Sequence, residues 1–379
     1  MLIGIKSMSL SGIEGYLVDV QVDVSNGLPS WDIVGLPDTS VKESKERVRA
    51  AIKNSGHYLH SQKIVINLAP ASTKKEGSFF DLPIAVGILC NIELIQSEHI
   101  GDYIFIGELS LDGKLNQVHG ILPMCIEALR LGIHKVIVPY ENRLEAGIVK
   151  GIEVYPAHDL SEVIDHLNGV QPIPPFATKP EEVLIEKELS KIDFSEVKGQ
   201  ENVKRALEIA AAGSHNCLLI GSPGSGKTML SRRIATILPQ LSFEESLEIT
   251  KIHSIAGVLP PNIGLISTRP FRSPHHTISS AALTGGGRIP KPGEISLAHR
   301  GVLFLDELPE FNRNVLEAMR TPLEDHVVTI SRTNSSISYP CNFMLIASMN
   351  PCPCGYHGTP EKECTCSPGM IEKYINKIS

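Results

Sequence analysis

The sequence predicts an α/β protein of two domains, the second of which is built on a parallel sheet. Its 379 residues are 42% apolar, enough for about two cores at roughly 150 residues per domain. Short apolar runs alternate with helical patterns along the chain, as in α/β folds. Four prolines between residues 172 and 180 interrupt this alternation, because proline cannot extend a helix or a central strand. We therefore expect one domain at 1–168, a linker at 169–192 and a second domain at 193–379.

Composition and charge limit the classes of function. Asp and Glu outnumber Lys and Arg by 42 to 35, and the net charge of −7 argues against a uniformly basic nucleic-acid-binding surface but not against a local basic site. No run of about 18 apolar residues predicts a membrane span, and the N-terminus lacks the pattern of a secretion signal. We expect a cytoplasmic protein with no membrane partner, whose eight cysteines are thiols or metal ligands rather than disulfides.

Strand and helix patterns alternate in the N-terminal domain. Apolar and polar residues alternate from 17 to 24, which is the period of a half-buried strand, and residues 38–54 have the spacing of an amphipathic helix. The predicted strands are 17–24, 63–68, 103–107 and 135–139, and the predicted helices are 38–54, 82–90 and 123–131. This order predicts an α/β or α+β domain.

The C-terminal domain has short strands that are apolar throughout. It begins with a predicted helix at 201–212, and the predicted strands are 217–220, 302–305 and 343–347. Strands without a polar face are typical of a parallel sheet that helices cover on both sides.

A glycine-rich segment, the phosphate loop (residues 221–228), follows the first of these strands. It matches the pattern G-x-x-x-x-G-K-[ST], which binds nucleotide phosphates when it lies between a strand and a helix. Its glycines let backbone N–H groups converge on phosphate oxygens. Lys227 is expected to reach the β- and γ-phosphates, and the Thr228 hydroxyl to ligate Mg²⁺. The alternative is a glycine-rich turn with an incidental lysine.

Two carboxylates follow the strand at 302–305, at the end where open α/β sheets bind ligands. We expect Asp306 to hold Mg²⁺ through water and Glu307 to be the general base for the attacking water, although such a pair often only caps a helix. Asn350, after the next strand, is expected to orient that water or contact the γ-phosphate, or else to cap a turn. The predicted catalytic residues are Glu307, Lys227 and Asn350, and the predicted nucleotide-binding residues are Gly221, Ser222, Pro223, Gly224, Ser225, Gly226, Lys227, Thr228 and Asp306.

These motifs resemble those of the AAA+ ATPases, in which the segment similar to residues 193–200 lies near the adenine. Residues 271–276, 285–288, 292–294 and 350–355 further resemble the magnesium-chelatase-like ComM/YifB family, and the similarity extends over essentially the whole chain. The resemblance implies a P-loop AAA+ domain and an ATP hydrolase that forms a hexameric ring. It also implies a DNA helicase that promotes branch migration in homologous recombination and natural transformation, the competence pathway.

The family also has an arginine finger and a helical lid beyond the position that matches Ser379. We therefore expect that the lid is missing, that the chain is part of a longer protein, and that alone it hydrolyses ATP slowly.

A basic insertion separates the two halves of the predicted site. Residues 265–300 carry five basic side chains against Glu294 alone, a net charge of +4. The resemblance implies that this insertion faces the central pore of the ring, where cations contact phosphates without reading sequence. Residues 329–341 are a second predicted hairpin of this kind. The alternative is a solvated loop with surface ion pairs. The predicted DNA contacts are Arg269, Arg272, Arg288, Lys291 and Arg332.

Residues 63–142 resemble the Lon protease domain. By alignment, Phe79 occupies the position of the Lon serine and Leu122 that of the lysine, and neither side chain can attack a carbonyl or accept a proton. Ser78 is the neighbouring hydroxyl. A Lon-like domain without the dyad also occurs in the bacterial branch-migration motor RadA. We therefore expect a Lon-protease-like domain that is inactive and has a structural role in ring assembly or DNA guidance.

Four cysteines lie close together near the C-terminus. Cys352, Cys354, Cys364 and Cys366, the cysteine cluster, form two C-x-C pairs separated by nine residues. Four thiolates can close a tetrahedral Zn²⁺ site with no open position, so Zn²⁺ is a candidate structural cofactor. Reduced thiols and a redox disulfide are the alternatives, and His357 is a spare ligand.

The sequence thus favours an ATP- and Mg²⁺-dependent ring motor that acts on single-stranded or branched DNA. The first alternative is a magnesium-chelatase-like ATPase that remodels a protein partner, although the chelatase subunit lacks the Lon-like domain. The second is a binding module in which the nucleotide only controls assembly.

Overall fold

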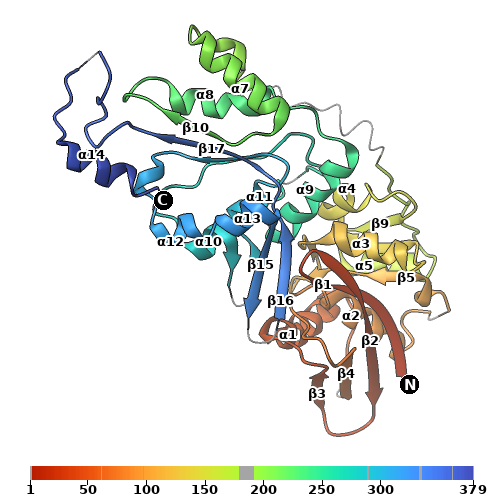
Figure 1. The fold of residues 1–379 in the computed structure, drawn as a ribbon. Coiled ribbons are helices and arrows are strands. Elements are labelled where there is room, and N and C mark those ends of the chain that lie inside the picture. The colour runs from red at the N-terminus through yellow and green to blue at the C-terminus, as the bar shows by residue number, and fades with distance from the viewer. Residues whose placement is uncertain are drawn as a thin grey trace. The chain divides into compact units, whose positions relative to one another are not determined.

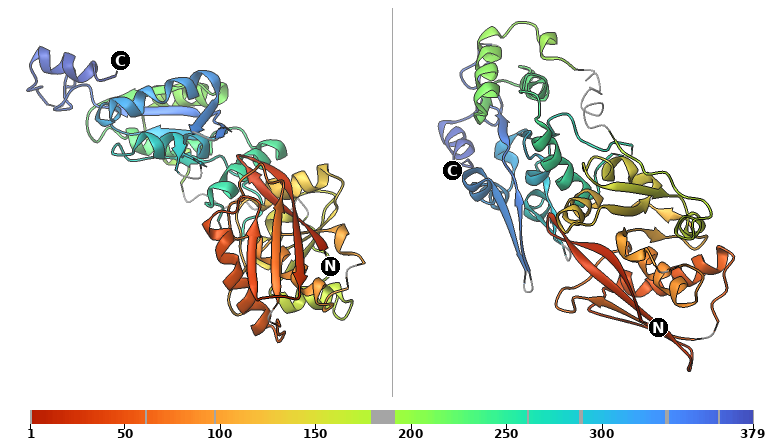
Figure 2. Two further views of the ribbon diagram at one scale, coloured as in Figure 1. Left: turned by 90° about the horizontal axis from the view of Figure 1, so that it is seen from below. Right: turned by 90° about the vertical axis from the view of Figure 1, so that its right-hand side faces the viewer.

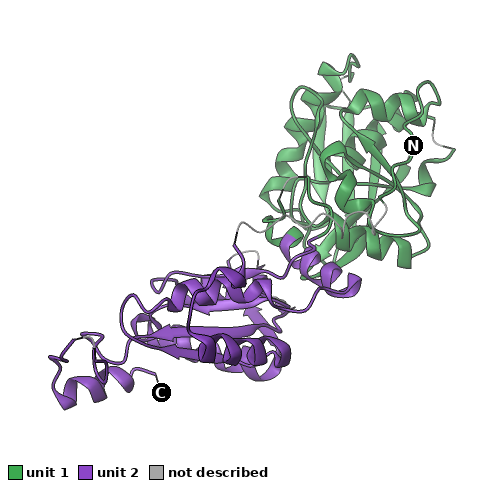
Figure 3. Cartoon of the chain, turned by 90° about the horizontal axis from the view of Figure 1, so that it is seen from above, with its two compact units in different colours: residues 1–183, 254–265 green, residues 184–253, 266–379 purple. Residues whose placement is uncertain are grey.

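The computed structural model describes residues 2–60, 62–96, 98–178, 192–260, 262–287, 290–332, 335–360 and 362–378 (Figure 1). The chain forms two compact units, each described here by itself (Figure 3). Unit 1 comprises residues 1–183 and 254–265, and unit 2 comprises residues 184–253 and 266–379. Residues 254–265, which the sequence-based division placed in the second domain, therefore belong to unit 1. Much of the predicted linker, 169–192, lies outside the described residues.

The larger sheet of unit 1 has the strand order β1-β2-β4-β3. The pairs β1–β2 and β2–β4 are antiparallel, and β3–β4 is parallel. Its strands are β1 (Leu2–Ser11), β2 (Glu14–Ser25), β3 (Ser30–Val34) and β4 (Lys63–Ala69). Val18, Val20 and Val22 alternate along β2 and are fully buried, which accounts for the period-two pattern of the sequence. These long strands are drawn in red and brown in Figure 2.

Three helices of unit 1 lie on or beside this sheet: α1 (Thr39–Asn54), α2 (Asp81–Asn91) and α3 (Ile121–Arg130). α1 begins where the Asp38 carboxylate accepts a hydrogen bond from Val41 N–H at 2.8 Å, a side-chain N-cap. α2 and α3 pack against β1 and β2, and α1 packs against α2. Because α2 is apolar on all sides, ten of its eleven residues are buried.

A smaller parallel sheet of order β5-β8-β9 completes unit 1. Its strands are β5 (Tyr103–Phe105), β8 (Lys135–Pro139) and β9 (Glu153–Ala157). The short elements around it are β6 (Glu108–Leu109), β7 (Leu115–Asn116), α4 (Arg143–Ala146), α5 (Leu160–Leu167), η1 (Ile100–Asp102) and η2 (Tyr140–Asn142). The strands and helices predicted for this domain are all present, whereas β1, β3, β9 and α5 were not predicted.

Unit 2 is built on a parallel sheet of order β10-β17-β14-β11. Its strands are β10 (Cys217–Ile220), β11 (Phe271–Arg272), β14 (Val302–Leu305) and β17 (Met344–Met349). β17 comes last in the chain but lies between β10 and β14 (Figure 1). The segments that follow these three strands therefore leave the same edge of the sheet next to one another. The predicted α/β class with a parallel sheet is confirmed.

Helices and two hairpins surround this sheet. The helices are α7 (Glu201–Gly213), α8 (Lys227–Arg233), α9 (Phe243–Ala256), α10 (Ser280–Thr284), α11 (Glu294–Leu297), α12 (Arg313–Glu317), α13 (Arg320–Asp325) and α14 (Pro368–Ile375), with η3 (Phe194–Glu196), η4 (Ile234–Thr236) and η5 (Leu308–Glu310). The hairpins pair β12 (Gly285–Gly286) with β13 (Lys291–Pro292), and β15 (Val327–Arg332) with β16 (Ser335–Pro340). The second of them is the hairpin predicted at 329–341.

The core beside the sheet is formed by apolar side chains of α7, α8, β14, β17 and the short turns η3 and η4. Its members are Phe194, Val197, Leu207, Ala210, Ala211, Leu230, Ile234, Val302, Phe304, Met344 and Ile346. This packing fixes the strand ends from which the candidate site is built. Among the described residues, no helix has the length and the apolar character that crossing a membrane requires.

Candidate nucleotide-binding site

The phosphate loop leaves the end of β10 and leads directly into α8. Gly224 and Gly226 have φ angles of +80° and +86°, in the left-handed region that side chains disfavour, so the glycines of the motif permit this backbone path. Gln200 steadies the loop from outside, because its Nε2 donates a hydrogen bond to Ser225 O at 2.7 Å. The strand, loop and helix therefore have the order that phosphate binding requires.

Lys227 folds back over the phosphate loop. Its Nζ donates hydrogen bonds to Gly221 O at 2.7 Å, to Ser222 O at 2.9 Å and to Asn350 Oδ1 at 3.2 Å. Burial lowers the pKa of Lys227, while the nearby carboxylates of Asp306 and Glu307 act in the opposite direction. The ammonium group thus lies where it can turn from backbone carbonyls to phosphate oxygens.

Thr228 and Asp306 meet across the sheet. Thr228 Oγ1 donates a hydrogen bond to Asp306 Oδ2 at 2.7 Å, although the two residues are 78 positions apart. The other oxygen, Asp306 Oδ1, accepts hydrogen bonds from Ser348 Oγ and, at 3.1 Å, from Glu307 N–H. A hydroxyl and a carboxylate side by side are hard oxygen donors of the kind that Mg²⁺ prefers next to phosphates, so the donor set fits the predicted ion.

The side chain of Glu307 is not part of this hydrogen-bond network. Its backbone is left-handed, with φ of 56°, and its side chain is 60% exposed. His276 is a basic neighbour: its Nδ1 lies 3.9 Å from Glu307 Oε2, and the two form an ion pair only when the imidazole is protonated. An accessible carboxylate beside the Thr228–Asp306 pair has the position that a general base requires. The structure thus brings Lys227, Thr228, Asp306 and Asn350 together and leaves Glu307 adjacent, and their catalytic roles remain predictions.

The residues predicted to contact DNA occupy different environments. Arg269 is bound inside unit 2: its guanidinium donates to Pro239 O, Arg300 O and Glu245, and its side chain is 14% exposed. Arg272 makes a bidentate pair with Glu294, both N–O distances being 2.6 Å, and this partner raises its pKa.

The other candidates for DNA contact lie on the two hairpins. Lys291 is exposed on β13, and Arg332 ends β15 opposite Ser335. Arg288 lies outside the described residues. Arg269 and Arg272 thus have acceptors within unit 2, whereas Lys291 is exposed, and the DNA contacts of all these residues remain predictions.

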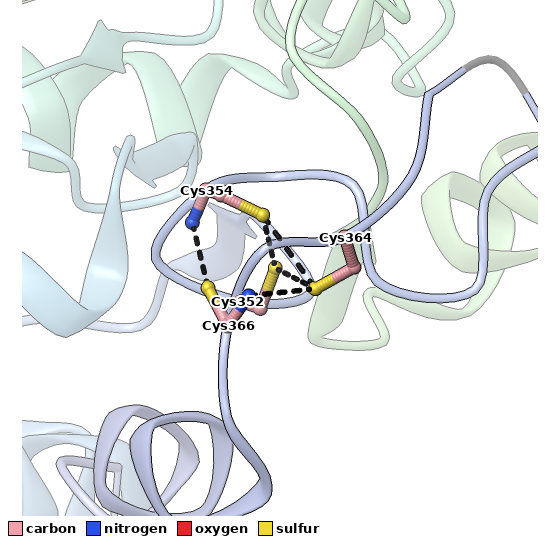
Figure 4. Close-up of side chains that lie close together, drawn as sticks. All are labelled: Cys352, Cys354, Cys364 and Cys366. Carbon is pink, nitrogen blue, oxygen red and sulfur yellow. Dashed lines mark hydrogen bonds between the residues drawn. The ribbon is translucent and has the colours of Figure 1, made fainter.

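The four sulfur atoms of the cysteine cluster face one another (Figure 4) and all lie within 4.8 Å. Cys352 Sγ is 3.3 Å from Cys354 Sγ and 3.7 Å from Cys364 Sγ, and the last two are 3.6 Å apart. Tetrahedral Zn²⁺ with bonds of about 2.3 Å requires sulfurs about 3.8 Å apart, so the cluster fits this ion. The imidazole of His357 is not part of the cluster, but its backbone N–H donates to Cys352 Sγ at 3.3 Å.

The electrostatics of the cluster also suit a cation. Backbone N–H groups of Tyr356 and Thr365 lower the pKa of Cys354 to about 5, which favours a thiolate. For Cys364 the N–H of Cys366 acts in the same direction, but burial and the neighbouring sulfurs raise the pKa to about 12. A second negative charge is thus disfavoured unless a cation compensates it.

Several residues of the site were not predicted from the sequence. Ser348 donates a hydrogen bond to Asp306 and could have been found from the sequence, because it is a polar residue in an otherwise apolar strand, two positions before Asn350. His276 could not have been placed beside Glu307 by spacing alone. Tyr374, on α14, makes a hydrogen bond with the Asn350 backbone, a contact for which the sequence gives no signal.

Comparisons with known proteins agree with this geometry. Residues 193–379 match the family described as magnesium chelatase, subunit ChlI, and residues 20–142 match the family described as subunit ChlI of Mg-chelatase. The competence protein ComM of Haemophilus influenzae is 43% identical over 378 residues, covering 99% of this chain and 73% of that protein. The uncharacterized protein YifB of Escherichia coli is 45% identical over 368 residues, covering 97% and 71%.

A more distant relative covers less of the chain. The magnesium-chelatase 38 kDa subunit of Rhodobacter capsulatus is 25% identical over 176 residues, 42% of this chain and 50% of that subunit. The family matches support an ATPase of the AAA+ type and with it ATP and Mg²⁺, while the Lon-like character of unit 1 remains a prediction. The identity of the ComM and YifB matches, over 97% or more of this chain, confirms the predicted relationship, and the chain belongs to the magnesium-chelatase-like ComM/YifB family.

Proposed function

We propose that this chain is the motor of a hexameric ring helicase that hydrolyses ATP and promotes branch migration of DNA in recombination and natural transformation. The observation that carries the ATPase activity is the meeting of Thr228 with Asp306 and of Lys227 with Asn350 at one edge of the unit 2 sheet. The similarity to a competence protein over 99% of the chain supports the role in DNA handling.

In the proposed reaction each residue has a separate task. The backbone N–H groups of the phosphate loop bind the phosphates, and Lys227 exchanges its carbonyl partners for the γ-phosphate. Thr228 and Asp306 would hold Mg²⁺, which would neutralise charge on the phosphates when bound. Glu307 accepts the proton of the attacking water, and Asn350 orients that water or the phosphate.

The proposed DNA contacts are on the hairpins of unit 2. Lys291 is exposed on β13, and β15 ends in Arg332. Cations on such hairpins would bind phosphates without reading sequence. Arg269 and Arg272 contribute through the shape of the insertion, because both already bind acceptors within unit 2. Arg288 keeps its proposed role from the sequence alone.

We propose two further roles for the rest of the chain. The cysteine cluster holds a structural Zn²⁺ ion, as the sulfur separations support. Unit 1 is a Lon-like domain without protease activity that serves ring assembly or DNA guidance in the cytoplasm. At the predicted dyad positions Phe79 is nearly buried and Leu122 fully buried, and the Ser78 hydroxyl donates to Glu108.

A second candidate is remodelling of a protein partner, because both family matches are to a magnesium-chelatase subunit. One experiment separates the candidates. The protein is mixed with a four-way DNA junction, ATP and Mg²⁺, and strand exchange and phosphate release are measured, with Glu307→Gln as the control. Junction migration that this variant abolishes supports the DNA motor. An ATPase rate that DNA does not change, without migration, favours the chelatase-like role, and nucleotide-dependent assembly that survives in Glu307→Gln without turnover favours a switch.

A further inference from the structure

The loop that carries the cysteine cluster packs directly against the phosphate loop. Gly355, between Cys354 and the next turn, has a φ angle of +88°, and a β-carbon at this position would lie 2.6 Å from Pro223 Cδ and 2.7 Å from Pro223 Cγ. The same β-carbon would lie 3.9 Å from Asn350 Cγ. The backbone at residue 355 therefore occupies space that only glycine leaves free, against the loop that is expected to bind ATP.

The sulfur atoms determine the shape of this turn. Gly355 N–H donates to Cys352 O at 2.9 Å, which closes a four-residue turn that contains the first two cysteines. Cys354 N–H donates to Cys366 Sγ at 3.4 Å, so the turn is also tied to the second C-x-C pair (Figure 4). A metal ion that held the four sulfurs would hold Gly355 as well, because Gly355 directly follows the ligand Cys354 and is hydrogen-bonded to the backbone of the ligand Cys352.

The C-terminal end of the loop lies next to Asn350, where the loop begins. Cys366 is followed by α14, and Tyr374 on that helix makes a hydrogen bond with the backbone of Asn350, where the loop begins. Asn350 in turn accepts the hydrogen bond from Lys227. The segment from Asn350 to Tyr374 thus begins and ends at the candidate nucleotide site, and the cysteine cluster lies between its two ends.

We infer that the cysteine cluster is a Zn²⁺ centre that positions the phosphate loop through the Gly355–Pro223 contact, so that ATP affinity depends on zinc. This inference rests on the proposed nucleotide and zinc sites and adds a coupling between them. A loop that is already held in its binding geometry pays less ordering entropy when the ligand binds, which is how a structural ion changes affinity for a ligand that it does not touch.

The test measures zinc content by atomic absorption and the Kd of a fluorescent ATP analogue at constant Mg²⁺. The wild-type protein should contain one equivalent of zinc. Removal of zinc with a chelator that spares Mg²⁺, or by Cys364→Ser combined with Cys366→Ser, should weaken ATP binding by about tenfold. Cys90→Ala, in unit 1, is the control for cysteine replacement and should change neither quantity.

A pair of glycine variants tests the contact while leaving the ligands in place. Gly355→Ala should keep zinc and lose ATP affinity by about tenfold, because the new methyl group displaces Pro223. Gly358→Ala is its matched control: its φ of +74° is equally left-handed, but nothing lies within 4 Å of its β-carbon. Pro223→Ala removes both clashing atoms and should restore part of the affinity in the Gly355→Ala background.

The outcomes are distinct. Wild-type protein that binds no ATP analogue would overturn the proposed function itself. ATP binding without zinc in the purified protein would overturn the metal centre. Zinc binding with an ATP affinity that neither chelation nor Gly355→Ala changes would overturn the coupling alone, and both proposed sites would stand.

Discussion

Unit 1 and unit 2 have opposite kinds of side chain at the positions that sequence resemblance marks as candidates for chemistry. In unit 1 the positions that the Lon resemblance aligns with the serine and the lysine hold Phe79 and Leu122, which are 9% and 0% exposed. In unit 2 the candidate positions hold polar side chains: Thr228 donates a hydrogen bond to Asp306, and Lys227 donates one to Asn350. The comparison teaches that the side chains at a position decide which chemistry is possible there, whatever fold surrounds them.

The carboxylates of the two units differ in the same way. Glu145 of unit 1 is 4% exposed and accepts hydrogen bonds from Leu122 N–H, Ser254 Oγ and Asn142 Nδ2, so its oxygens are occupied in holding the unit together. Glu307 of unit 2 is exposed and next to the candidate Mg²⁺ ligands. Glu145 thus has a structural role in unit 1, whereas Glu307 is available for the proposed proton transfer.

The largest expected effect comes from removing the accessible carboxylate. Glu307→Gln should lower the rate of ATP hydrolysis by about 10²–10⁴-fold, because an amide cannot accept the proton of the attacking water. ATP binding should remain, since the Glu307 side chain is 60% exposed and the substitution leaves the phosphate loop and its backbone N–H groups in place. Phosphate release and binding of a fluorescent ATP analogue measure the two quantities. Glu310→Gln, an exposed carboxylate three residues along, is the control, and a Glu307→Gln variant that hydrolyses ATP at the wild-type rate would contradict the assignment.

The second largest effect is expected at Leu122, the buried apolar residue of unit 1. Leu122→Ala should reduce the free energy of unfolding of unit 1 by about 3 kcal/mol, because it leaves a cavity at a fully buried position. The single tryptophan, Trp31 on β3, reports the unfolding of unit 1 in a denaturant titration. Leu111→Ala, at a leucine that is 58% exposed, should cost less than about 0.5 kcal/mol. Equal midpoints for the two variants would show that Leu122 is not part of the core.

The buried carboxylate makes a pH-dependent contribution to unit 1. Burial raises the pKa of Glu145 above its ordinary value of 4.5, against the opposing effect of its hydrogen-bond donors. The folded state therefore keeps a proton that the unfolded state releases, and stability falls as pH rises from 4.5 toward the folded-state pKa. Glu145→Gln does not titrate and avoids this loss.

We expect the free energy of unfolding of Glu145→Gln to increase relative to that of the wild type as the pH rises from 4 to 7. Trp31 fluorescence in denaturant at several pH values measures it. Glu141→Gln, at an exposed residue, should show no such trend. A constant difference for Glu145→Gln across this range would mean that Glu145 has the same pKa in the folded and unfolded chains.

The sequence predicted the parts of the site that are contiguous in the chain. The phosphate loop and Asp306 follow from local motifs whose backbone path is nearly independent of the rest of the fold. Ser348 escaped prediction because it reaches Asp306 through strand pairing over 42 positions. The Arg272–Glu294 pair was not predicted because it joins strand β11 to helix α11 over 22 positions of the chain, and the proposed DNA contact of Arg272 stays a prediction.

The fold shows the same limit. β2 was predicted because its valines alternate with polar residues, whereas β1, its partner, was not. Ser7 and Ser9 of β1 are buried, and Ser7 Oγ donates to Phe105 O at 2.8 Å, so hydroxyl groups take positions at which apolar side chains would have given a periodic signal. A strand that buries hydroxyl groups beside its apolar side chains is recognised only when the hydrogen-bond partners of those hydroxyls are known.

The smallest expected effect concerns Lys291, an exposed basic residue of the insertion. Lys291→Ala should weaken binding to a DNA junction by a factor of about 5 and lower the slope of log affinity against log salt concentration by about 1, because one phosphate contact is lost. Fluorescence anisotropy at several salt concentrations measures both. The control is Arg205→Ala, at a cation that is 72% exposed on α7 and outside the insertion. If the salt slope were unchanged in Lys291→Ala, this edge of unit 2 would not contact DNA, and the basic character of residues 265–300 would reflect internal ion pairs such as Arg272–Glu294.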